Sequence, residues 1–498
     1  MKMKKFDNKK QLWDNLNKEI KVQIERMNYM IEKNQDYDVD IIDMGYEGEG
    51  ITKINGYTTF VKGALKGEKA KIKMLKVNKD YGFAKLLEVI EESRDREEPV
   101  CENFSKCGGC NLQHMSYEAQ LEHKENIVRS TLKKALGHEV EVNKVIGMGI
   151  PYNYRNKAGY PVVDGKIGFY RDRSHSLIEN KECAIQNQEA DKIARIAFEA
   201  IKKNGVQSYN EKTNKGVLRH IVTRIGKNTG ETMLMLVTNE TELKNKEKIV
   251  KEIVEKYPQI TTIVQNINKE NSNVILGEKC ITLYGEGYIV DRLGDYKFKI
   301  SPLSFYQVNP TQTEVLYNIA LKYAGLTGTE TVFDLYCGIG TISIFVAEHA
   351  KKVYGVEIVK PAVEDAKINA EMNEIKNAEF ICGEAEKIVP EMYQKGIKAD
   401  VVFIDPPRKG CGIELLETIV KMKASKIVYI SCNVATLARD LKYLTENGLE
   451  IKEVQPVDMF PQTRSCGDLC TTNIEKSIVA KILIQEKCGF VHHLSTKI

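Results

Sequence analysis

The sequence of 498 residues predicts a multidomain α/β protein with a small N-terminal β-barrel, a central mixed α/β domain and a C-terminal doubly wound sheet. Two patterns carry this prediction. Short alternating segments near the N-terminus are typical of barrel strands, and beyond about residue 291 strands and helices alternate strictly. The length is sufficient for about three domains, each with its own hydrophobic core.

Residues 1–33 form the first element, which we interpret as an amphipathic helical extension carrying nine basic and five acidic residues. The whole chain has 73 Lys or Arg and 69 Asp or Glu, a net charge of +4 that excludes a histone-like polycation. No apolar run is long enough to span a membrane, and the N-terminus is too charged for a signal peptide. We therefore expect a cytoplasmic protein with no membrane partner.

Residues 34–93 are predicted to form the small, OB-like β-barrel. Lysine and apolar residues alternate along 69–77, as in a strand with one solvated basic face. Residues 49–85 hold nine lysines and three acidic residues, and an acidic stretch follows. Such a face is most often ordinary solvated surface, but neighbouring aromatic rings favour an RNA platform, because bases stack on rings while lysines neutralise phosphates. These rings are Tyr57, Phe60, Tyr81 and Phe83.

Residues 94–290 read as a mixed α/β domain, with strands at 220–225 and 232–237 and a cluster of cysteines. Cys101, Cys107 and Cys110 form a C-x5-C-x2-C pattern, which brings three thiolates close enough for one metal centre. Cys183 is the best candidate for a fourth ligand. Four cysteine ligands suit either zinc or an iron–sulfur cluster, and unligated buried cysteines are the less favoured alternative.

Residues 291–498 are predicted to form a doubly wound, Rossmann-like domain. An apolar strand at 331–335 ends in a turn with Gly338 and Gly340, which lets the backbone approach a ligand. Ser343 occupies the place of the third glycine in a dinucleotide fingerprint, whereas Glu357 ends the next strand and can accept hydrogen bonds from a ribose. A nucleoside donor such as S-adenosylmethionine therefore fits better than NAD. The remaining predicted strands are 352–356, 378–381, 400–404 and 426–430.

Two further strand ends reach the same carboxyl edge of the predicted sheet. Asp405 opens the segment Asp-Pro-Pro-Arg-Lys-Gly, and Cys432 lies within Ser-Cys-Asn after the following strand. A cysteine at a strand end is most often a small core residue. Cys432, however, lies where substrate and cofactor meet in open α/β sheets, which makes it a candidate nucleophile.

Together these segments resemble the TRAM-domain RNA (uracil-5-)-methyltransferases, which modify a uridine in bacterial 23S ribosomal RNA or in the T-loop of tRNA. The resemblance covers nearly the whole chain beyond the extension. It implies S-adenosylmethionine as methyl donor, a 4Fe–4S cluster on Cys101, Cys107, Cys110 and Cys183, a donor site lined by Gln307, Tyr336, Glu357 and Asp405, and Cys432 as nucleophile. It rests on the barrel, the cysteine pattern, the glycine turn and the segments Tyr154-Arg-Asn-Lys-Ala, Phe305-Tyr-Gln-Val-Asn, Asp405-Pro-Pro-Arg-Lys-Gly, Ser431-Cys-Asn and Asp458-Met-Phe-Pro-Gln-Thr.

The expected chemistry explains these residue types. A thiolate that adds to carbon 6 of uracil makes carbon 5 nucleophilic enough to take the methyl group, after which a base removes the carbon 5 proton. We expect Arg408 or Lys409 to assist thiolate formation. The target uridine must leave its stack, so RNA with a flipped-out base is the expected substrate.

The C-terminal tail departs from the family pattern. The family follows Phe-Pro-x-Thr closely by His-Val-Glu, whose glutamate is the expected base, but no glutamate follows Thr463 at that offset. Glu475, which precedes an apolar segment at 478–484, is the preferred candidate for the base, and Asp468 is the second. The alternative is that the altered tail retains no base.

The leading hypothesis is methylation of a uridine in 23S ribosomal RNA, with the tRNA T-loop uridine as the second target. An RNA-binding protein that has lost turnover through its altered tail is the competing hypothesis from another class. The sequence contains nothing that demands more than a monomer.

Overall fold

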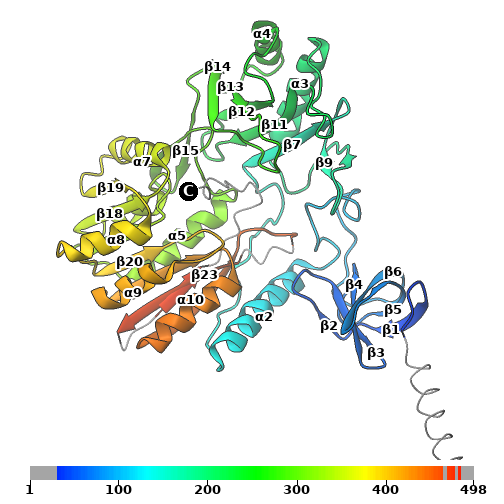
Figure 1. Ribbon diagram of the computed structural model, residues 1–498, viewed down its shortest axis with the longest axis horizontal. Coiled ribbons are helices and arrows are strands. Elements are labelled where there is room, and N and C mark those ends of the chain that lie inside the picture. The colour runs from blue at the N-terminus through cyan, green and yellow to red at the C-terminus, as the bar shows by residue number, and fades with distance from the viewer. Residues whose placement is uncertain (1–30, 464–467, 477–479, 484–498) are drawn as a thin grey trace, which may run out of the picture. The chain divides into compact units, whose positions relative to one another are not determined.

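The computed structural model describes residues 31–463, 468–476 and 480–483. They form two compact units (Figure 1). The first holds the described residues up to Glu98 together with His114–Ser116, and the second holds Pro99–Gln113 and the described residues from Tyr117 onward. The predicted helical extension lies outside the described residues except for its last three positions. In the part of the chain that is described, no helix has the length and apolar character needed to cross a bilayer.

The first unit is a six-stranded sheet wrapped around a small apolar core, as the sequence predicts for residues 34–93. The lysine-alternating segment forms one strand, in which Ala70, Ile72 and Met74 point inward and the lysines point outward. The order of the strands is β1-β5-β6-β4-β3-β2. Their bounds are β1 Asp36–Asp40, β2 Asp43–Met44, β3 Gly50–Ile54, β4 Tyr57–Lys62, β5 Lys69–Val77 and β6 Tyr81–Glu91.

The second unit begins with a long helix and a mixed sheet of order β14-β13-β12-β11-β7-β8. The strands predicted at 220–225 and 232–237 are present as β11 (Leu218–Ile225) and β12 (Thr232–Thr238). The helices of this region are α2 (Tyr117–Leu136), α3 (Gln188–Lys203) and α4 (Lys246–Lys256). Its other strands are β7 (Lys157–Val163), β8 (Lys166–Ile167), β9 (Phe169–Tyr170), β10 (Leu177–Ile178), β13 (Thr262–Ile267) and β14 (Lys279–Tyr284).

The larger sheet of the second unit has the order β19-β18-β17-β20-β21-β23-β22-β24. Its first five strands run parallel, as the sequence predicts. The central strands β17, β20 and β21 are apolar runs buried on both faces, whereas the edge strand β19 is partly exposed. The strands are β17 (Thr331–Leu335), β18 (Lys352–Glu357), β19 (Ala378–Cys382), β20 (Val401–Ile404), β21 (Lys426–Ser431), β22 (Leu449–Asp458), β23 (Asp468–Lys476) and β24 (Ala480–Leu483), preceded by the hairpin β15 (Ile289–Leu293) and β16 (Tyr296–Ile300).

Two layers of helices cover this sheet, which gives the doubly wound arrangement. The first layer is α5 (Pro310–Ala324), α6 (Thr341–Ala347) and α7 (Lys360–Met372), and the second is α8 (Ala385–Gln394), α9 (Ile413–Met422) and α10 (Val434–Glu446), with α2 packed against α10. Asn309 caps α5 by accepting a hydrogen bond from the backbone N–H of Gln312, with Pro310 in the first turn.

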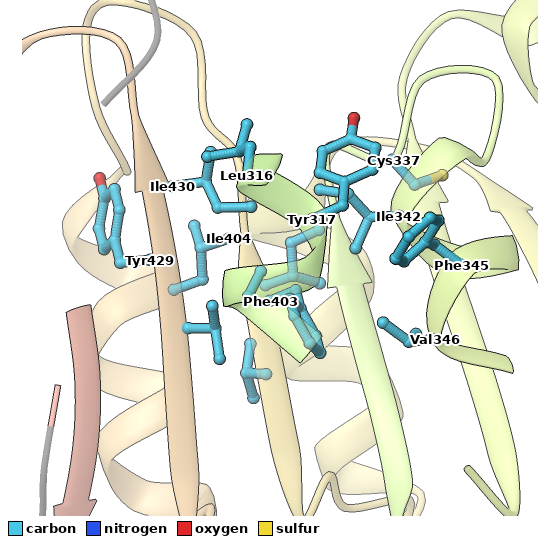
Figure 2. Packing of buried hydrophobic residues seen from close by; sticks show 14 of the residues in the cluster. Leu316, Tyr317, Cys337, Ile342, Phe345, Val346, Phe403, Ile404, Tyr429 and Ile430 are labelled. Carbon is cyan, nitrogen blue, oxygen red and sulfur yellow. The ribbon is translucent and has the colours of Figure 1, made fainter. Parts of the chain in front are cut away.

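The core lies between the sheet and these helices. Figure 2 shows Leu316 and Tyr317 of α5 lying over Phe403, Ile404 and Ile430 of the central strands. The same apolar cluster includes residues of α2 and of β11 to β13. The central and C-terminal regions, which the sequence divides at residue 290, therefore share one compact unit.

Candidate active site

A cleft of about 460 Å³, open to solvent, lies at the carboxyl edge of the parallel strands. It is lined by all four residues expected at the donor site: Gln307, Tyr336, Glu357 and Asp405. Ligands of open α/β sheets bind at this edge, near the point where the strand order reverses between β17 and β20.

The glycine turn after β17 shapes the floor of the cleft. Gly338 and Gly340 both have positive φ, and a Cβ at Gly340 would lie 3.0 Å from the ring of Phe380. Tyr336 adopts φ of 64°, an unusual conformation for a residue with a side chain, and its hydroxyl donates to Glu386 Oε1 at 2.7 Å. The turn therefore needs glycines where the chain packs closely and holds Tyr336 in one position.

The carboxylate of Glu357 is fixed before any ligand arrives. Its Oε2 accepts a hydrogen bond from the N–H of Gly338 at 3.0 Å, and its Oε1 accepts one from Val359 at 2.8 Å. A carboxylate has about four acceptor positions, so two bonds leave capacity for further donors. Glu357 can thus receive two hydroxyl groups of a ribose, as the sequence predicts.

Two further carboxyl groups lie beside Glu357. Asp405 is buried at the end of β20, and Asp334 is fully buried in β17, where its Oδ2 accepts a hydrogen bond from the Ser343 hydroxyl at 2.5 Å. Burial, together with the charges of Asp405 and Glu357, raises the pKa of Asp334 to about 7, although the hydrogen bond from Ser343 acts to lower it. This concentration of negative charge favours a cationic ligand.

Two further tyrosines line the cleft, and neither is among the site residues expected from the sequence. Tyr317 on α5 bonds through its hydroxyl to Thr341 at 3.0 Å, and Tyr306 is buried beside Gln307. Tyr306 lies within the Phe305-Tyr-Gln-Val-Asn segment, which is a usable signal. Tyr317 fits the apolar periodicity of a helix that packs on the core, so nothing in the local sequence distinguishes it from an ordinary core residue.

Cys432 lies directly between β21 and α10, and only 3% of its surface is exposed. Asn433 caps α10 by accepting a hydrogen bond from Ala435, so the thiol stands at the N-terminus of this helix, where negative charge is favoured. Strands β20 and β21 are parallel neighbours, which brings Asp405 and Cys432 to the same edge of the sheet.

Arg408 and Lys409, expected to assist thiolate formation, have exposed side chains. The backbone of this segment contacts the residues that follow Cys432. The carbonyl of Arg408 accepts hydrogen bonds from the side chains of Asn433 at 3.2 Å and Thr436 at 3.1 Å. An electrostatic role for the two cations stays a prediction.

Both candidate bases, Asp468 and Glu475, lie on the tail strand β23. Cys470 pairs with Ser431 and Asp468 pairs with Asp458, so β23 begins at the carboxyl edge beside Cys432. Glu475 pairs with Glu450, five residues further along a strand that runs away from this edge, about 17 Å at the usual rise. The backbone register therefore does not bring Glu475 to Cys432 and leaves Asp468 nearer to it, and the identity of the base stays a prediction. This placement arises because β23 starts at 468, before the apolar segment taken from the sequence as the strand.

The four clustered cysteines belong to the second unit, and none of them forms a disulfide. The Cys110 thiol interacts electrostatically with the other three, so the segments that carry them converge. Burial raises the pKa of Cys183 to about 11 and also raises those of Cys107 and Cys110, so four thiolates need compensating positive charge. A metal bound to all four would supply this charge, and such a centre stays a prediction. Among the described residues, no three Cys, His, Asp or Glu side chains form a ready site for a metal ion.

The basic face predicted for residues 69–77 is present, because the lysines of β5 lie on its outward side. Two of these lysines are offset by acidic neighbours: Lys69 Nζ lies 3.5 Å from Glu91 Oε1, and Lys73 Nζ lies 3.3 Å from Asp36 Oδ1.

The aromatic rings gather on the adjoining strands β4 and β6. The rings of Phe60, Tyr81 and Phe83 have centroid distances between 5.7 and 6.0 Å. Lys85 of β6 lies in register between Lys62 of β4 and Lys73 of β5, and residues directly opposite one another in neighbouring strands share a face. The rings and the lysines therefore lie on one outer face of the barrel.

Known proteins share both units. Residues 116–471 match the family described as tRNA (uracil-5-)-methyltransferase, and residues 32–87 match the TRAM domain. An uncharacterised RNA methyltransferase of Clostridium tetani is 52% identical over 437 residues, covering 87% of this chain and 95% of the relative. One from Clostridium acetobutylicum is 52% identical over 441 residues, covering 87% and 96%.

A solved structure is also similar over nearly the whole chain. The crystal structure of Pyrococcus abyssi tRNA (uracil-54, C5)-methyltransferase in complex with S-adenosyl-L-homocysteine has a TM-score of 0.70 and 29% identity, covering 90% of this chain and 99% of that one. The resemblance found in the sequence is confirmed. The chain belongs to the tRNA (uracil-5-)-methyltransferase family of RNA methyltransferases and carries a TRAM domain at residues 32–87.

Proposed function

We propose that the protein transfers a methyl group from S-adenosylmethionine to carbon 5 of a specific uridine in RNA, through a covalent bond between Cys432 and carbon 6 of the base. The observation that carries the proposal is the placement of the donor cleft and Cys432 at one edge of the parallel sheet. A methyl donor in the cleft and a uracil beside Cys432 would be neighbours.

The donor site suits S-adenosylmethionine in both shape and charge. Glu357 receives the ribose hydroxyls, while Gln307, Tyr336 and Asp405 line the remainder of the cleft. The sulfonium and the amino group of the donor are cationic, and the carboxyl groups of Glu357 and Asp405 that line the cleft attract them. After transfer the sulfonium becomes a neutral thioether, which weakens this attraction and favours product release.

The reaction begins when the Cys432 thiolate adds to carbon 6 of the flipped-out uracil. The electron pair of the carbon 5–carbon 6 double bond then makes carbon 5 nucleophilic, and carbon 5 takes the methyl group from the sulfonium. A base removes the carbon 5 proton, the double bond forms again, and the thiolate leaves. The N-terminus of α10 stabilises the thiolate at the beginning and at the end of the cycle.

Asp468 is the base in this proposal. Its backbone position opposite Asp458 lies at the carboxyl edge, whereas the register carries Glu475 away from it. A carboxylate that removes the carbon 5 proton typically contributes two to four orders of magnitude to such a step.

The substrate is an RNA in which a uridine can be extruded. A uridine of 23S ribosomal RNA is the first candidate, from the resemblance of the sequence motifs. The T-loop uridine of tRNA is the second, supported by the solved relative, which is named for uracil 54 of tRNA. In either case the TRAM domain binds RNA, the reaction takes place in the cytoplasm, and one chain is sufficient.

Cys101, Cys107, Cys110 and Cys183 would hold a 4Fe–4S cluster, with zinc as the less favoured alternative. The support is the convergence of the four thiols and their need for positive charge. The cluster would supply a structural crosslink between sequence-distant segments. No step of methyl transfer involves it.

Methyl transfer from labelled S-adenosylmethionine into total RNA tests the function. We expect label in RNA with the wild-type protein and none with Cys432→Ala. Electrophoretic sizing of the labelled RNA then separates ribosomal from transfer RNA. Absence of label with a folded protein that binds S-adenosylhomocysteine would refute the proposal and favour an RNA-binding protein without turnover.

A further inference from the structure

A buried aspartate on α10 bonds to the loop that leaves the donor cleft. Only 1% of the surface of Asp440 is exposed, and its Oδ2 accepts hydrogen bonds from the backbone N–H of Cys411 at 2.9 Å and from the Tyr429 hydroxyl at 2.6 Å. Its Oδ1 pairs with Arg439, with 2.8 Å to Nε and 2.6 Å to Nη2. A buried carboxylate is tolerated only with such partners, so its position is closely determined.

The same face of α10 holds the preceding loop residues by their backbone carbonyls. Arg439 Nη2 donates to the carbonyl of Lys409 at 2.9 Å and to that of Cys411 at 3.3 Å. Asn433 and Thr436 donate to the carbonyl of Arg408. We call Asn433, Thr436, Arg439 and Asp440 the α10 clamp.

Gly410 shows how closely the loop and the helix approach each other. It has φ of 75°, and an added Cβ would lie 2.5 Å from Arg439 Nη2 and 2.6 Å from Asp440 Oδ2. A larger residue at this position is excluded by both the backbone conformation and the space. The contact therefore requires glycine at 410.

The clamp joins the segment that follows the donor cleft to the helix that follows the proposed nucleophile. The loop follows Asp405 at the end of β20, and α10 follows Cys432 at the end of β21. Methyl transfer requires the sulfonium carbon, carbon 5 and the Cys432 sulfur in one fixed arrangement, and a displacement of about 1 Å can cost a factor of about 100 in rate. Backbone hydrogen bonds between loop and helix set this arrangement more rigidly than the two strands alone.

We propose that Asp440, with Arg439, is a positioning residue that fixes Cys432 relative to the donor cleft by tying the loop 408–411 to α10. This inference rests on the proposed function. Asp440 touches neither donor nor uracil in this scheme and acts through the loop and the helix.

Arg439→Gln and Gly410→Ala test the clamp from its two sides. Arg439 is half exposed, and its replacement takes the cation from the buried Asp440 carboxylate, which keeps its hydrogen bonds from Cys411 and Tyr429. We expect each variant to lower kcat by about 10- to 100-fold. The KM for S-adenosylmethionine and the Kd for S-adenosylhomocysteine should change by less than about threefold, since the interaction matters in the transition state. Asp440→Asn, which keeps an acceptor oxygen for Cys411 and Tyr429, should lose less activity than Asp440→Ala.

A second measurement does not depend on turnover. Because Cys432 is almost completely buried, a loosened clamp should speed its alkylation by iodoacetamide about tenfold, measured by peptide mapping. Lys442→Ala is the matched control, because Lys442 lies on the same helix in an exposed pair with Glu446 and should change neither rate. The amount of folded enzyme is normalised by S-adenosylhomocysteine binding, which removes a merely structural loss.

The outcomes separate the two proposals. If the wild type methylates RNA but Arg439→Gln and Gly410→Ala keep kcat within twofold, or if only the Kd for S-adenosylhomocysteine changes, the positioning role is overturned. If the wild type methylates no RNA, the proposed function fails. In that case unchanged alkylation of Cys432 in both variants would still overturn the clamp, and faster alkylation would support it.

Discussion

Lys124 and Asp458 form an ion pair in which both side chains are fully buried, with 2.6 Å between Nζ and Oδ1. Tyr117 donates to the other carboxylate oxygen at 3.0 Å, and Lys124 also donates to the carbonyl of Phe460 at 3.2 Å. The pair therefore joins α2 to the segment Asp458-Met-Phe-Pro-Gln-Thr, which directly precedes the tail. Sequence positions more than 300 residues apart meet there.

Lys124→Met should lower the free energy of unfolding by about 3–5 kcal/mol, because it leaves the Asp458 carboxylate buried without its cation. Denaturant unfolding of the second unit measures this loss. Lys133→Met on the same helix is the control, since Lys133 pairs with Glu139 at the surface and should cost less than about 1 kcal/mol. A loss below about 1 kcal/mol for Lys124→Met would contradict the assigned role of the pair.

The sequence predicts the parallel sheet well because its central strands are buried on both faces and are therefore apolar runs. It also predicts that Glu357 and Asp405 lie together in one cleft, since both stand at strand ends, and strand ends of a parallel sheet share one edge. Both features can be predicted because they depend on short stretches of sequence, the apolar strands and the residues that end them.

The sequence fails where the answer depends on distant pairing. Nothing local shows that Lys69 and Lys73 pair with Glu91 and Asp36, so the sequence alone overstates the positive charge of this strand. Likewise, the position of Glu475 depends on the direction of β23 and on its register with β22. Asp440 was missed because a charged residue on an amphipathic helix reads as solvated surface.

Asp334 predicts a specific dependence of stability on pH. Its pKa is raised to about 7 by burial in the folded protein, whereas the unfolded chain has the ordinary value near about 4. Between these values the Asp334 carboxyl is protonated in the folded protein and ionised in the unfolded chain. Its contribution to the free energy of unfolding is therefore largest below about pH 4 and is lost as the pH rises to about 7. Relative to Asp334→Asn, the wild type should lose stability between pH 5 and pH 8.

Denaturant midpoints at pH 5, 6, 7 and 8 measure this difference for the ligand-free protein. Glu379→Gln removes an exposed carboxylate that pairs with Lys352 and should leave the pH profile parallel to the wild type. Parallel profiles for Asp334→Asn and the wild type would show that Asp334 is already ionised at pH 5.

The assignment of the base predicts opposite behaviour for two tail variants. Asp468→Asn should still form the covalent bond to RNA but should lower turnover by about 100-fold or more, because the carbon 5 proton stays in place. Glu475→Gln should turn over like the wild type. Denaturing electrophoresis of protein with labelled RNA detects the trapped adduct, and Cys432→Ala provides the blank. Accumulation of adduct in Glu475→Gln instead would restore Glu475 as the base.

The cysteine cluster predicts loss of metal on single substitutions. Cys107→Ser and Cys183→Ser should each remove most iron and sulfide from anaerobically purified protein and lower the Tm, because a three-cysteine site holds the cluster weakly. Cys280→Ser, at a partly buried cysteine outside the set, should keep the full iron content. A colourless wild type with one zinc per chain would contradict the iron–sulfur assignment while keeping the four ligands.

The lysines of the TRAM domain predict unequal effects of the same charge change. Lys85→Gln removes a positive charge from β6, the strand that carries Phe83, whereas Lys66→Gln removes one from the loop before β5, where Lys66 pairs with Asp43. We expect Lys85→Gln to weaken RNA binding by about threefold and to reduce the salt dependence by about one unit for the lost phosphate contact. Lys66→Gln should change binding by less than about twofold. Equal losses from both variants, measured as Kd over a salt series, would show that binding follows net charge and not the position of the lysine beside the rings.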